Sequence, residues 1–243
     1  MDIAVLDAKP GTARRADLIF TSSQVIFKRA RQLAPDVAAK NLGHALPPQW
    51  LHIAPARKTD PTGKRPVVAC AGNMSIRFLD WEVLHTEVRD NPGADFRFVG
   101  PFDPLARDPW FRSIRKLPNV NFVGPLSKEQ MVPELRSADV LLLCYRADLW
   151  PEELANPHKL LEYLSTGNAI VASATSEYAG TAPSILQMAM ERWEHPALLA
   201  QVLNDLEHFN ATGPRQARME LARSHSINSQ LDLIERTIQS ECR

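Results

Sequence analysis

Short apolar runs alternate along the chain with segments in which apolar residues recur every three or four positions. The runs are rich in β-branched and aromatic residues and predict five strands, at residues 66–72, 95–100, 120–124, 139–145 and 169–173. Each run is almost continuously apolar, which is typical of a parallel sheet that is covered on both faces. We therefore expect helices on both sides of one parallel sheet.

The segments between the runs have helical patterns. The first predicts a helix that stops at Asn91-Pro92-Gly93 and whose apolar face comprises Leu79, Val83, Leu84 and Val88. Ser127 and Gln130 form a capping box before the fourth run, and they begin a helix with the apolar residues Met131, Leu135 and Ala138. From about residue 195 only helical patterns follow. Residues 66–190 are thus predicted to form a doubly wound α/β domain with a parallel sheet, followed by a helical C-terminal tail.

The first 60 residues differ from this domain. They predict a strand at 16–23, a helix at 23–33 and a second strand at 37–43, followed by a proline-rich stretch at 44–66 without periodicity. We interpret that stretch as an interdomain linker. Two strands and one helix provide too little core to fold alone, so we expect residues 1–60 to be the remnant of one domain and residues 61–243 to form another.

Composition narrows the class of protein. The 243 residues are 44% hydrophobic and 23% charged, and 28 basic residues balance 28 acidic ones. This predicts a globular chain with no general affinity for nucleic acid. No apolar run approaches the roughly 18 residues of a transmembrane helix. At the N-terminus the basic residues follow a very short apolar stretch, whereas in a secretory signal they precede a longer one. The cysteines, Cys70, Cys144 and Cys242, lie far apart, which indicates free thiols and a cytoplasmic location.

Ligands of open parallel sheets bind beyond the carboxyl ends of the strands. After the first predicted strand, Gly72 permits a tight turn, and a ligand anion could be bound by Asn73, Ser75 and Arg77. The loop contains neither a dinucleotide-binding glycine motif nor a P-loop. An ordinary polar turn explains the same residues equally well.

The stretch before the last strand carries a stronger pattern. Asn156 is a suitable N-cap and Pro157 a suitable first helical residue, and Gly167 is expected just past the helix end. His158 and Lys159 then place backbone N–H groups and a positive charge where a diphosphate binds. Glu162 could accept hydrogen bonds from the two hydroxyls of a ribose. The alternative is an ordinary helix pair between Lys159 and Glu162.

Other candidate chemistry is weaker. The histidines, including His44, His85, His158 and His195, have no metal-ligand spacing, and no Ser-His-Asp grouping is recognisable, so no metal is expected. The acidic loop at 146–155 lies where a substrate would be bound. The apolar residues of 188–193 are interpreted as core rather than as cofactor contacts.

Two stretches carry a resemblance to a known family. "NVNFVGPLSKEQMVPELRSADVLLLCYR" and "NPHKLLEYLSTGNAIVAS" resemble the C-terminal, donor-binding domain of group 1 glycosyltransferases of the GT-B fold. "ADLIFTSSQ" is similar to the end of that family's N-terminal acceptor domain, and "NLGHALPP" to the crossover between the two domains. The resemblance extends roughly over residues 16–205 and is strongest at 119–173.

This resemblance implies that a nucleoside-diphosphate sugar binds between two Rossmann-like domains and that a hexose is transferred with retention of configuration. Glu162 is similar to the glutamate that holds the ribose, and residues 158–159 to the helix start that binds the diphosphate. The turn from Gly72 to Arg77 matches the one facing the phosphates, and the base would contact Gly124, Pro125 and Leu126. The sugar nucleotide is the substrate, and no separate cofactor is expected.

The sequence departs from the family pattern at two points. The family often has a second glutamate seven residues before the ribose glutamate; that position matches Leu154, one place after Glu153. The chain also resembles only the end of the family's acceptor domain. We therefore expect poor transfer by this chain alone, and either self-association or a partner chain. Two alternatives remain: a nucleotide-sugar-binding module without turnover, and another GT-B enzyme such as an epimerase, whose usual histidine and acidic residues are not recognisable.

Overall fold

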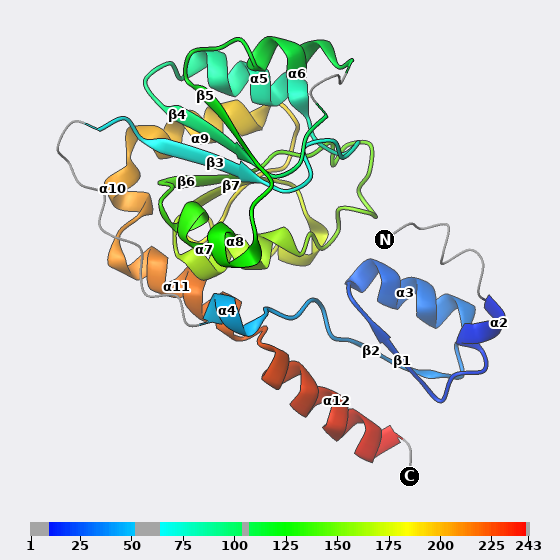
Figure 1. The fold of residues 1–243 in the computed structure, drawn as a ribbon. Helices are drawn as coiled ribbons and strands as arrows, with labels where there is room; N and C mark the ends of the chain where they lie inside the picture. Colours follow the sequence, from blue (N-terminus) through cyan, green and yellow to red (C-terminus); the bar gives the residue numbers. More distant parts are fainter. Residues whose placement is uncertain (1–9, 52–63, 104–106, 242–243) are drawn as a thin grey trace.

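The computed structural model describes residues 10–51, 64–103 and 107–241. Its main feature is a six-stranded sheet in the order β5-β4-β3-β6-β7-β8, in which every neighbouring pair is parallel (Figure 1). The strands are β3 Val67–Ala71, β4 Asp95–Val99, β5 Val120–Gly124, β6 Val140–Leu143, β7 Ala169–Ser173 and β8 Gln187–Ala189. The five predicted strands are confirmed, and β8 is an additional strand of three residues at one edge.

Helices cover both faces of this sheet, which confirms the doubly wound, Rossmann-like fold class (Figure 1). One face packs against α5 (Trp81–Asp90), α6 (Pro109–Ile114) and α9 (Glu194–Asn204). The other face packs against α7 (Lys128–Arg136), α8 (Lys159–Thr166) and α11 (Thr212–Arg223). Side chains along a strand alternate between the two layers: Val68 and Cys70 contact the first, and Ala69 and Ala71 the second.

Local signals explain where several helices begin and end. The capping box of α7 is present, with Ser127 accepting from the Gln130 backbone and the Gln130 side chain accepting from the Ser127 backbone. Asp80 caps α5 by accepting from the Val83 N–H. Gly167 ends α8 in the left-handed conformation, with φ 76°, as expected from its sequence position.

The N-terminal residues form a separate, two-stranded parallel sheet. The sheet consists of β1 (Leu18–Thr21) and β2 (Ala38–Asn41), and α3 (Gln24–Leu33) connects the two strands. The short helix α2 (Pro10–Ala13) precedes β1. This confirms the strand–helix–strand pattern, and we call residues 18–41 the N-terminal unit.

The stretch at residues 44–66, which we interpret as a linker, contains one short helix among its described residues. Residues 48–51 form helix α4 (Pro48–Leu51), and residues 52–63 lie outside the described part of the chain. Leu46 and Trp50 are buried in the core layer that also contains α8. Two buried residues are too few to produce a periodic apolar pattern, so the sequence did not reveal that this stretch packs on the core.

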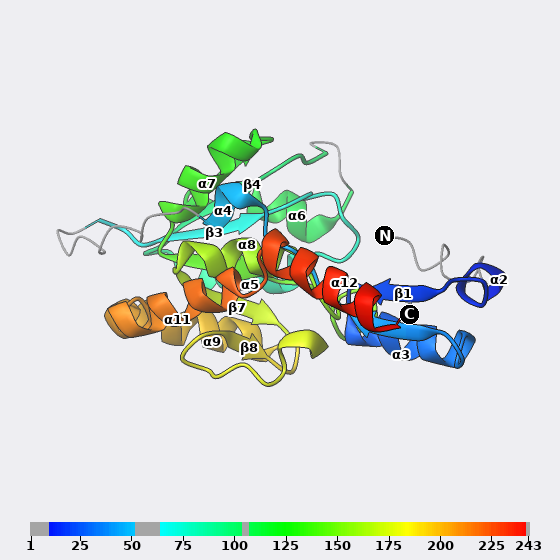
Figure 2. The ribbon, with the colours of Figure 1, turned by 90° about the horizontal axis from the view of Figure 1, so that it is seen from below.

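The C-terminal tail is helical, as predicted, and contains α9, α10 (Leu206–Phe209), α11 and α12 (Ile227–Glu241). Helix α12 extends back toward the N-terminal unit (Figure 2). Gln230 on α12 donates a hydrogen bond to the carbonyl of Leu42, just after β2, and the Leu46 N–H donates to the carbonyl of His225. Among the helices in the described ranges, none combines the length and the apolar character needed to cross a membrane.

The interpretation of residues 188–193 as core residues is correct only in part. Ala189 is buried in β8, but Met190 is 63% exposed and Trp193 is 53% exposed. The strand ends at Ala189, so the apolar residues that follow it lie outside the sheet.

Candidate functional site

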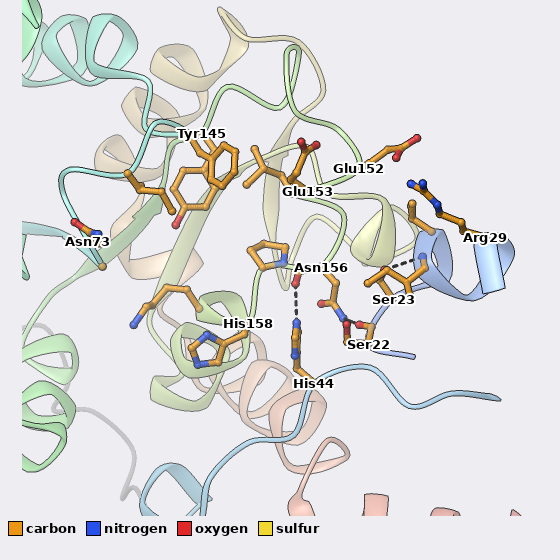
Figure 3. A pocket seen from close by; sticks show the side chains of 18 residues that line it. Ser22, Ser23, Arg29, His44, Asn73, Tyr145, Glu152, Glu153, Asn156 and His158 are labelled. Carbon is orange, nitrogen blue, oxygen red and sulfur yellow. Dashed lines mark hydrogen bonds between the residues drawn. The ribbon is translucent and has the colours of Figure 1, made fainter. Parts of the chain in front are cut away.

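A pocket of about 420 Å³ lies beyond the carboxyl ends of β3 and β6 (Figure 3). These two strands are neighbours in the sheet, but the chain visits β4 and β5 between them, on the far side of β3. The direction in which the sheet is built therefore reverses between β3 and β6. Such a switch point leaves a crevice because the loops after the two strands diverge, and ligands of open α/β sheets bind there.

The pocket has walls from several parts of the chain. Six of the predicted site residues line it: Gly72, Asn73, Asn156, Pro157, His158 and Lys159. The loop between β6 and α8 contributes Tyr145, Glu152, Glu153 and Leu154. The opposite wall comes from the N-terminal unit and the residues that follow it, namely Ser22, Ser23, Val25, Ile26, Arg29 and His44 (Figure 3).

The start of α8 corrects the prediction for Asn156 and Pro157. The helix begins at Lys159, and its N-cap is His158, which makes no capping hydrogen bond with its side chain. Residues 157–161 form a tight turn instead, in which Leu160 donates to the carbonyl of Pro157. Asn156 makes no capping hydrogen bond: its Nδ2 donates to the carbonyl of Ser22 at 2.6 Å, and its buried Oδ1, the atom that a cap would use as acceptor, has no hydrogen-bond partner in the described part of the chain.

Glu162 lies one turn into α8 and is 8% exposed. Its Oε1 accepts from His158 Nε2 at 2.9 Å, and its Oε2 accepts from Lys159 Nζ at 2.6 Å. Burial by itself raises the pKa of Glu162, but the hydrogen bond from His158 and the charge of Lys159 outweigh it, so the net pKa lies below the ordinary value. The helix pair considered as the alternative role of Lys159 and Glu162 is thus present, and it holds a carboxylate directly behind the pocket wall.

Five predicted residues do not line the pocket: Ser75, Arg77, Gly124, Leu126 and Glu162. The Ser75 hydroxyl accepts a hydrogen bond from the Asp103 N–H at 3.0 Å. Arg77 packs over the ring of Trp150, with 4.1 Å between its guanidinium carbon and the ring centroid. This cation–π contact turns the guanidinium toward the loop after β6.

Two hydrogen bonds join the walls of the pocket near α8. One is the bond from Asn156 to Ser22, and in the other His44 Nε2 lies 3.1 Å from the carbonyl oxygen of Asn156. Burial, followed by the proximity of His158, lowers the pKa of His44 below its ordinary value. Imidazole is therefore the favoured form of His44 near neutral pH, and the bond to the carbonyl requires the proton on Nε2.

Sequence reasoning missed the wall that the N-terminal unit provides. The sequence does predict that the acidic loop at 146–155 lies near a substrate, and its residues 152–154 line the pocket. Ser23 caps α3 by accepting from the Ile26 N–H, and this capping pattern of the sequence could have placed the start of α3. No local signal could show that this helix start faces α8, because the two segments lie more than a hundred residues apart.

One group among the described residues has a spacing that could suit a metal ion: Glu87, Cys144 and His195, with one ligand atom of each within 4.8 Å of the others. Sequence spacing did not reveal this group. His195 Nδ1 and Glu87 Oε1 are 2.5 Å apart, so a direct hydrogen bond occupies the space between them. The group lies within the core layer of α5 and α9, and none of its three residues lines the pocket, although Tyr145, next to Cys144, does. Cys70 and Cys144 are free, buried thiols, and burial raises the pKa of Cys70 to about 12; Cys242 lies outside the described residues.

Comparison with known proteins places this geometry in a family. The family described as "Glycosyl transferases group 1" matches residues 65–208. A protein of Bacillus subtilis (strain 168) named as the teichuronic acid biosynthesis glycosyltransferase TuaH is 26% identical over 95 residues, which are 39% of this chain and 23% of that protein.

Two solved structures are similar in fold. Sucrose-phosphate synthase from Thermosynechococcus elongatus has a TM-score of 0.71 at 15% identity, over 98% of this chain and 62% of the other. Anabaena Alr3699/HepE, solved in complex with UDP-glucose, has a TM-score of 0.72 at 16% identity, over 99% of this chain and 68% of the other. The chain thus spans about two thirds of the length of these structures.

Proposed function

The chain belongs to the group 1 glycosyl transferases, and we propose that it binds a nucleoside-diphosphate sugar in the pocket beside α8 for transfer of the sugar to an acceptor hydroxyl. The single observation that carries this proposal is the position of the pocket. It lies at the switch point of a doubly wound sheet and is bounded by the N-terminal turn of a helix that carries a lysine. Retention of configuration and a hexose as the transferred sugar complete the proposal, in line with the family resemblance.

The start of α8 supplies the chemistry for a diphosphate. The first N–H groups of a helix have no partners within the helix, and they form the positive end of its dipole. His158 and Lys159 line the pocket at this end, and the ammonium group of Lys159 adds a full positive charge. When the bond between sugar and diphosphate breaks, negative charge grows on the leaving group, and these groups stabilise it in place.

Glu162 is proposed to bind the ribose hydroxyls. Each of its oxygens accepts one hydrogen bond from its own helix, from His158 or from Lys159. A carboxylate has about four lone-pair sites, so two remain for a pair of hydroxyl donors. The carboxylate also neutralises part of the positive charge of Lys159, which keeps the lysine close to the helix axis until a phosphate competes for it.

The remaining donor contacts come from loops at the same edge of the sheet. Gly72 and Asn73 line the pocket after β3 and face the phosphates, with Ser75 and Arg77 further along the same loop. Arg77 must leave the Trp150 ring to reach a phosphate. The base is assigned to the loop after β5, at Gly124 to Leu126. In this proposal residues 61–243 bind the donor, and residues 1–60 belong to the acceptor side.

A second candidate function is nucleotide-sugar binding without turnover by this chain alone, or turnover only with a partner chain. It is favoured by Leu154, an apolar side chain that lines the pocket at the position where the family often has a second glutamate. A cytoplasmic location remains part of the proposal and rests on the free thiols of Cys70 and Cys144.

Two measurements test these proposals. A thermal-shift panel with UDP-, GDP-, ADP- and TDP-sugars should show stabilisation by one nucleotide class, because ligand that binds only the folded chain raises its stability. Hydrolysis of that sugar nucleotide, first by the chain alone and then with a candidate partner, separates the enzyme from the binding module. No stabilisation by any of the four classes would refute nucleotide-sugar binding.

A further inference from the structure

Glu177 joins the two walls of the pocket without lining it. It lies in the short helix η1 (Ser176–Tyr178), which follows β7. Its Oε2 accepts from the backbone N–H of Gln24 at 2.9 Å, and its Oε1 accepts from Asn41 Nδ2 at 2.8 Å. One carboxylate therefore contacts both the start of α3 and the end of β2.

Both contacts lead directly to residues of the pocket wall. Gln24 is the first residue of α3, and the first turns of that helix supply Val25, Ile26 and Arg29 to the pocket. Asn41 in turn accepts from the N–H of Gly43 at 3.3 Å, and the next residue, His44, lines the pocket. Glu177 thus fixes the two segments that carry the wall opposite α8.

The same residue is also anchored on the α8 side. The backbone N–H of Glu177 donates to the carbonyl of Ala155 at 3.0 Å, and Ala155 immediately precedes Asn156. The carboxylate faces the N-terminus of α3, where the helix dipole favours a negative charge. Hydrogen bonds to a charged group are also stronger than those between neutral groups.

We infer that Glu177 is a positioning residue that holds the wall formed by α3 at a fixed distance from the N-terminus of α8. We call the contacts of Glu177 with Gln24, Asn41 and Ala155, together with the hydrogen bond from Asn156 to Ser22, the clasp. The clasp follows from these contacts alone, and its effect on sugar transfer rests on the proposed function. Nothing in the resemblance to the glycosyltransferase family assigns a role to this position.

Amide hydrogen exchange tests the clasp without any ligand. In Glu177→Ala, exchange of peptides that cover residues 22–26 and 41–44 should be about tenfold faster than in the unaltered chain. Glu177→Gln should give a smaller increase, because its amide keeps one acceptor but turns an N–H group toward the N–H of Gln24.

Glu194→Gln is the matched control. The Glu194 carboxylate also accepts from two backbone N–H groups, those of Met190 and Glu191, but both lie in the segment directly before its own helix, α9. This variant should leave exchange at residues 22–26 unchanged. If the peptides that cover residues 22–26 and 41–44 exchange at the same rate in Glu177→Ala as in Glu194→Gln, the proposal that Glu177 holds the α3 wall is wrong.

The functional arm compares binding with turnover. UDP affinity should change by less than about twofold in Glu177→Gln, because the nucleotide contacts proposed above come from α8 and from the loops after β3 and β5, not from the α3 wall. Hydrolysis of UDP-glucose should fall about tenfold, mainly in kcat. Faster exchange with unchanged hydrolysis would overturn the positioning role. If the unaltered chain binds no nucleotide at all, the proposed function fails, and the exchange comparison alone decides whether the clasp exists.

Discussion

The two oxygens of Glu162 each accept a hydrogen bond from the same helix, from His158 and from Lys159. A carboxylate in this arrangement can serve the helix alone or can also hold two hydroxyls with its remaining lone pairs. Helix pairs of this kind contribute about 0.2–0.5 kcal/mol, whereas hydrogen bonds to charged groups contribute about 1.5–3 kcal/mol. Nucleotide affinity is therefore the property that separates the two roles.

We predict that Glu162→Gln weakens the binding of both the nucleoside diphosphate and the nucleoside of the class that the thermal-shift panel selects, by roughly tenfold to a hundredfold, because the proposed charged acceptor of the ribose is lost. Lys159→Ala should weaken binding of the nucleoside diphosphate more than that of the nucleoside, since its charge is proposed to contact the diphosphate. Calorimetric titration of both ligands measures these effects. Glu134→Gln, which alters a carboxylate paired with Arg97 on α7, serves as the control. Unchanged dissociation constants in folded Glu162→Gln would leave only the helix-pair role.

The lowered pKa of Glu162 also predicts how stability depends on pH. Because the folded chain binds the Glu162 proton less tightly than the unfolded chain, this residue contributes stability above the unfolded value near 4.5. That contribution is lost as the pH falls through the lower folded pKa. Thermal midpoints between pH 3 and 7 should therefore fall less steeply with acidification in Glu162→Gln than in the unaltered chain. Parallel profiles of the two proteins would contradict this.

Some residue roles could be predicted from the sequence and others could not. The Ser127–Gln130 box and the Gly167 cap depend on neighbours within a few positions, and both are present. Asn156 has the same local preference for a cap, but the fold places its side chain so that Nδ2 donates to the Ser22 carbonyl, 134 positions away, and Oδ1 has no hydrogen-bond partner among the described residues. A polar side chain satisfies whichever partner the fold brings to it, and local spacing contains no information about a partner so distant.

At the scale of elements, Gly100 shows how tightly the loops after β3 and β4 pack. It has a φ of 137°, and a Cβ on it would lie 1.8 Å from the carbonyl oxygen of Gly72. Gly100 also donates its N–H to the carbonyl of Gly124. Gly72 follows β3, Gly100 follows β4 and Gly124 ends β5, which are adjacent strands, and at Gly100 the backbones approach one another more closely than a side chain would allow.

We predict that Gly100→Ala destabilises the fold by about 3 kcal/mol or more, because the methyl group collides with backbone in addition to straining φ. Gly93→Ala is the control, since a Cβ at Gly93 meets no atom within 4 Å; it should change stability by less than about 0.5 kcal/mol. Chemical denaturation of both variants measures the difference. A Gly100→Ala protein as stable as Gly93→Ala would show that the β3 loop can move aside.

Element boundaries were predictable where burial produced a clear pattern. The long apolar runs gave the five central strands, because a strand buried on both faces is apolar at nearly every position. Strand β8 has only three residues and was missed, since so short a run cannot be distinguished from a loop. The start of α8 was placed too early because capping preferences ignore the tight turn at residues 157–161.

At the scale of the whole molecule, alternation of strands and helices was enough to predict the doubly wound sheet, because a crossover between parallel strands is almost always right-handed. The position of the ligand edge followed from the same rule. The second wall of the pocket did not, because it depends on how the N-terminal unit lies against the large sheet. Contacts such as those of Glu177 with Gln24 and Asn41 determine that arrangement.

A pocket with walls from two parts of the chain should respond to its ligands on both sides. We predict that UDP slows amide exchange mainly in peptides covering residues 72–74 and 157–160, where the proposed diphosphate contacts lie. UDP-glucose should add protection at residues 22–26, because Ser22, Ser23, Val25 and Ile26 line the same pocket opposite α8. Peptides from residues 128–136 in α7, which contribute nothing to the pocket, should exchange at the same rate throughout and serve as the control. If UDP-glucose protects only the segments that UDP protects, the α3 wall does not contact the donor sugar. The proposed role of that wall is then limited to binding the acceptor.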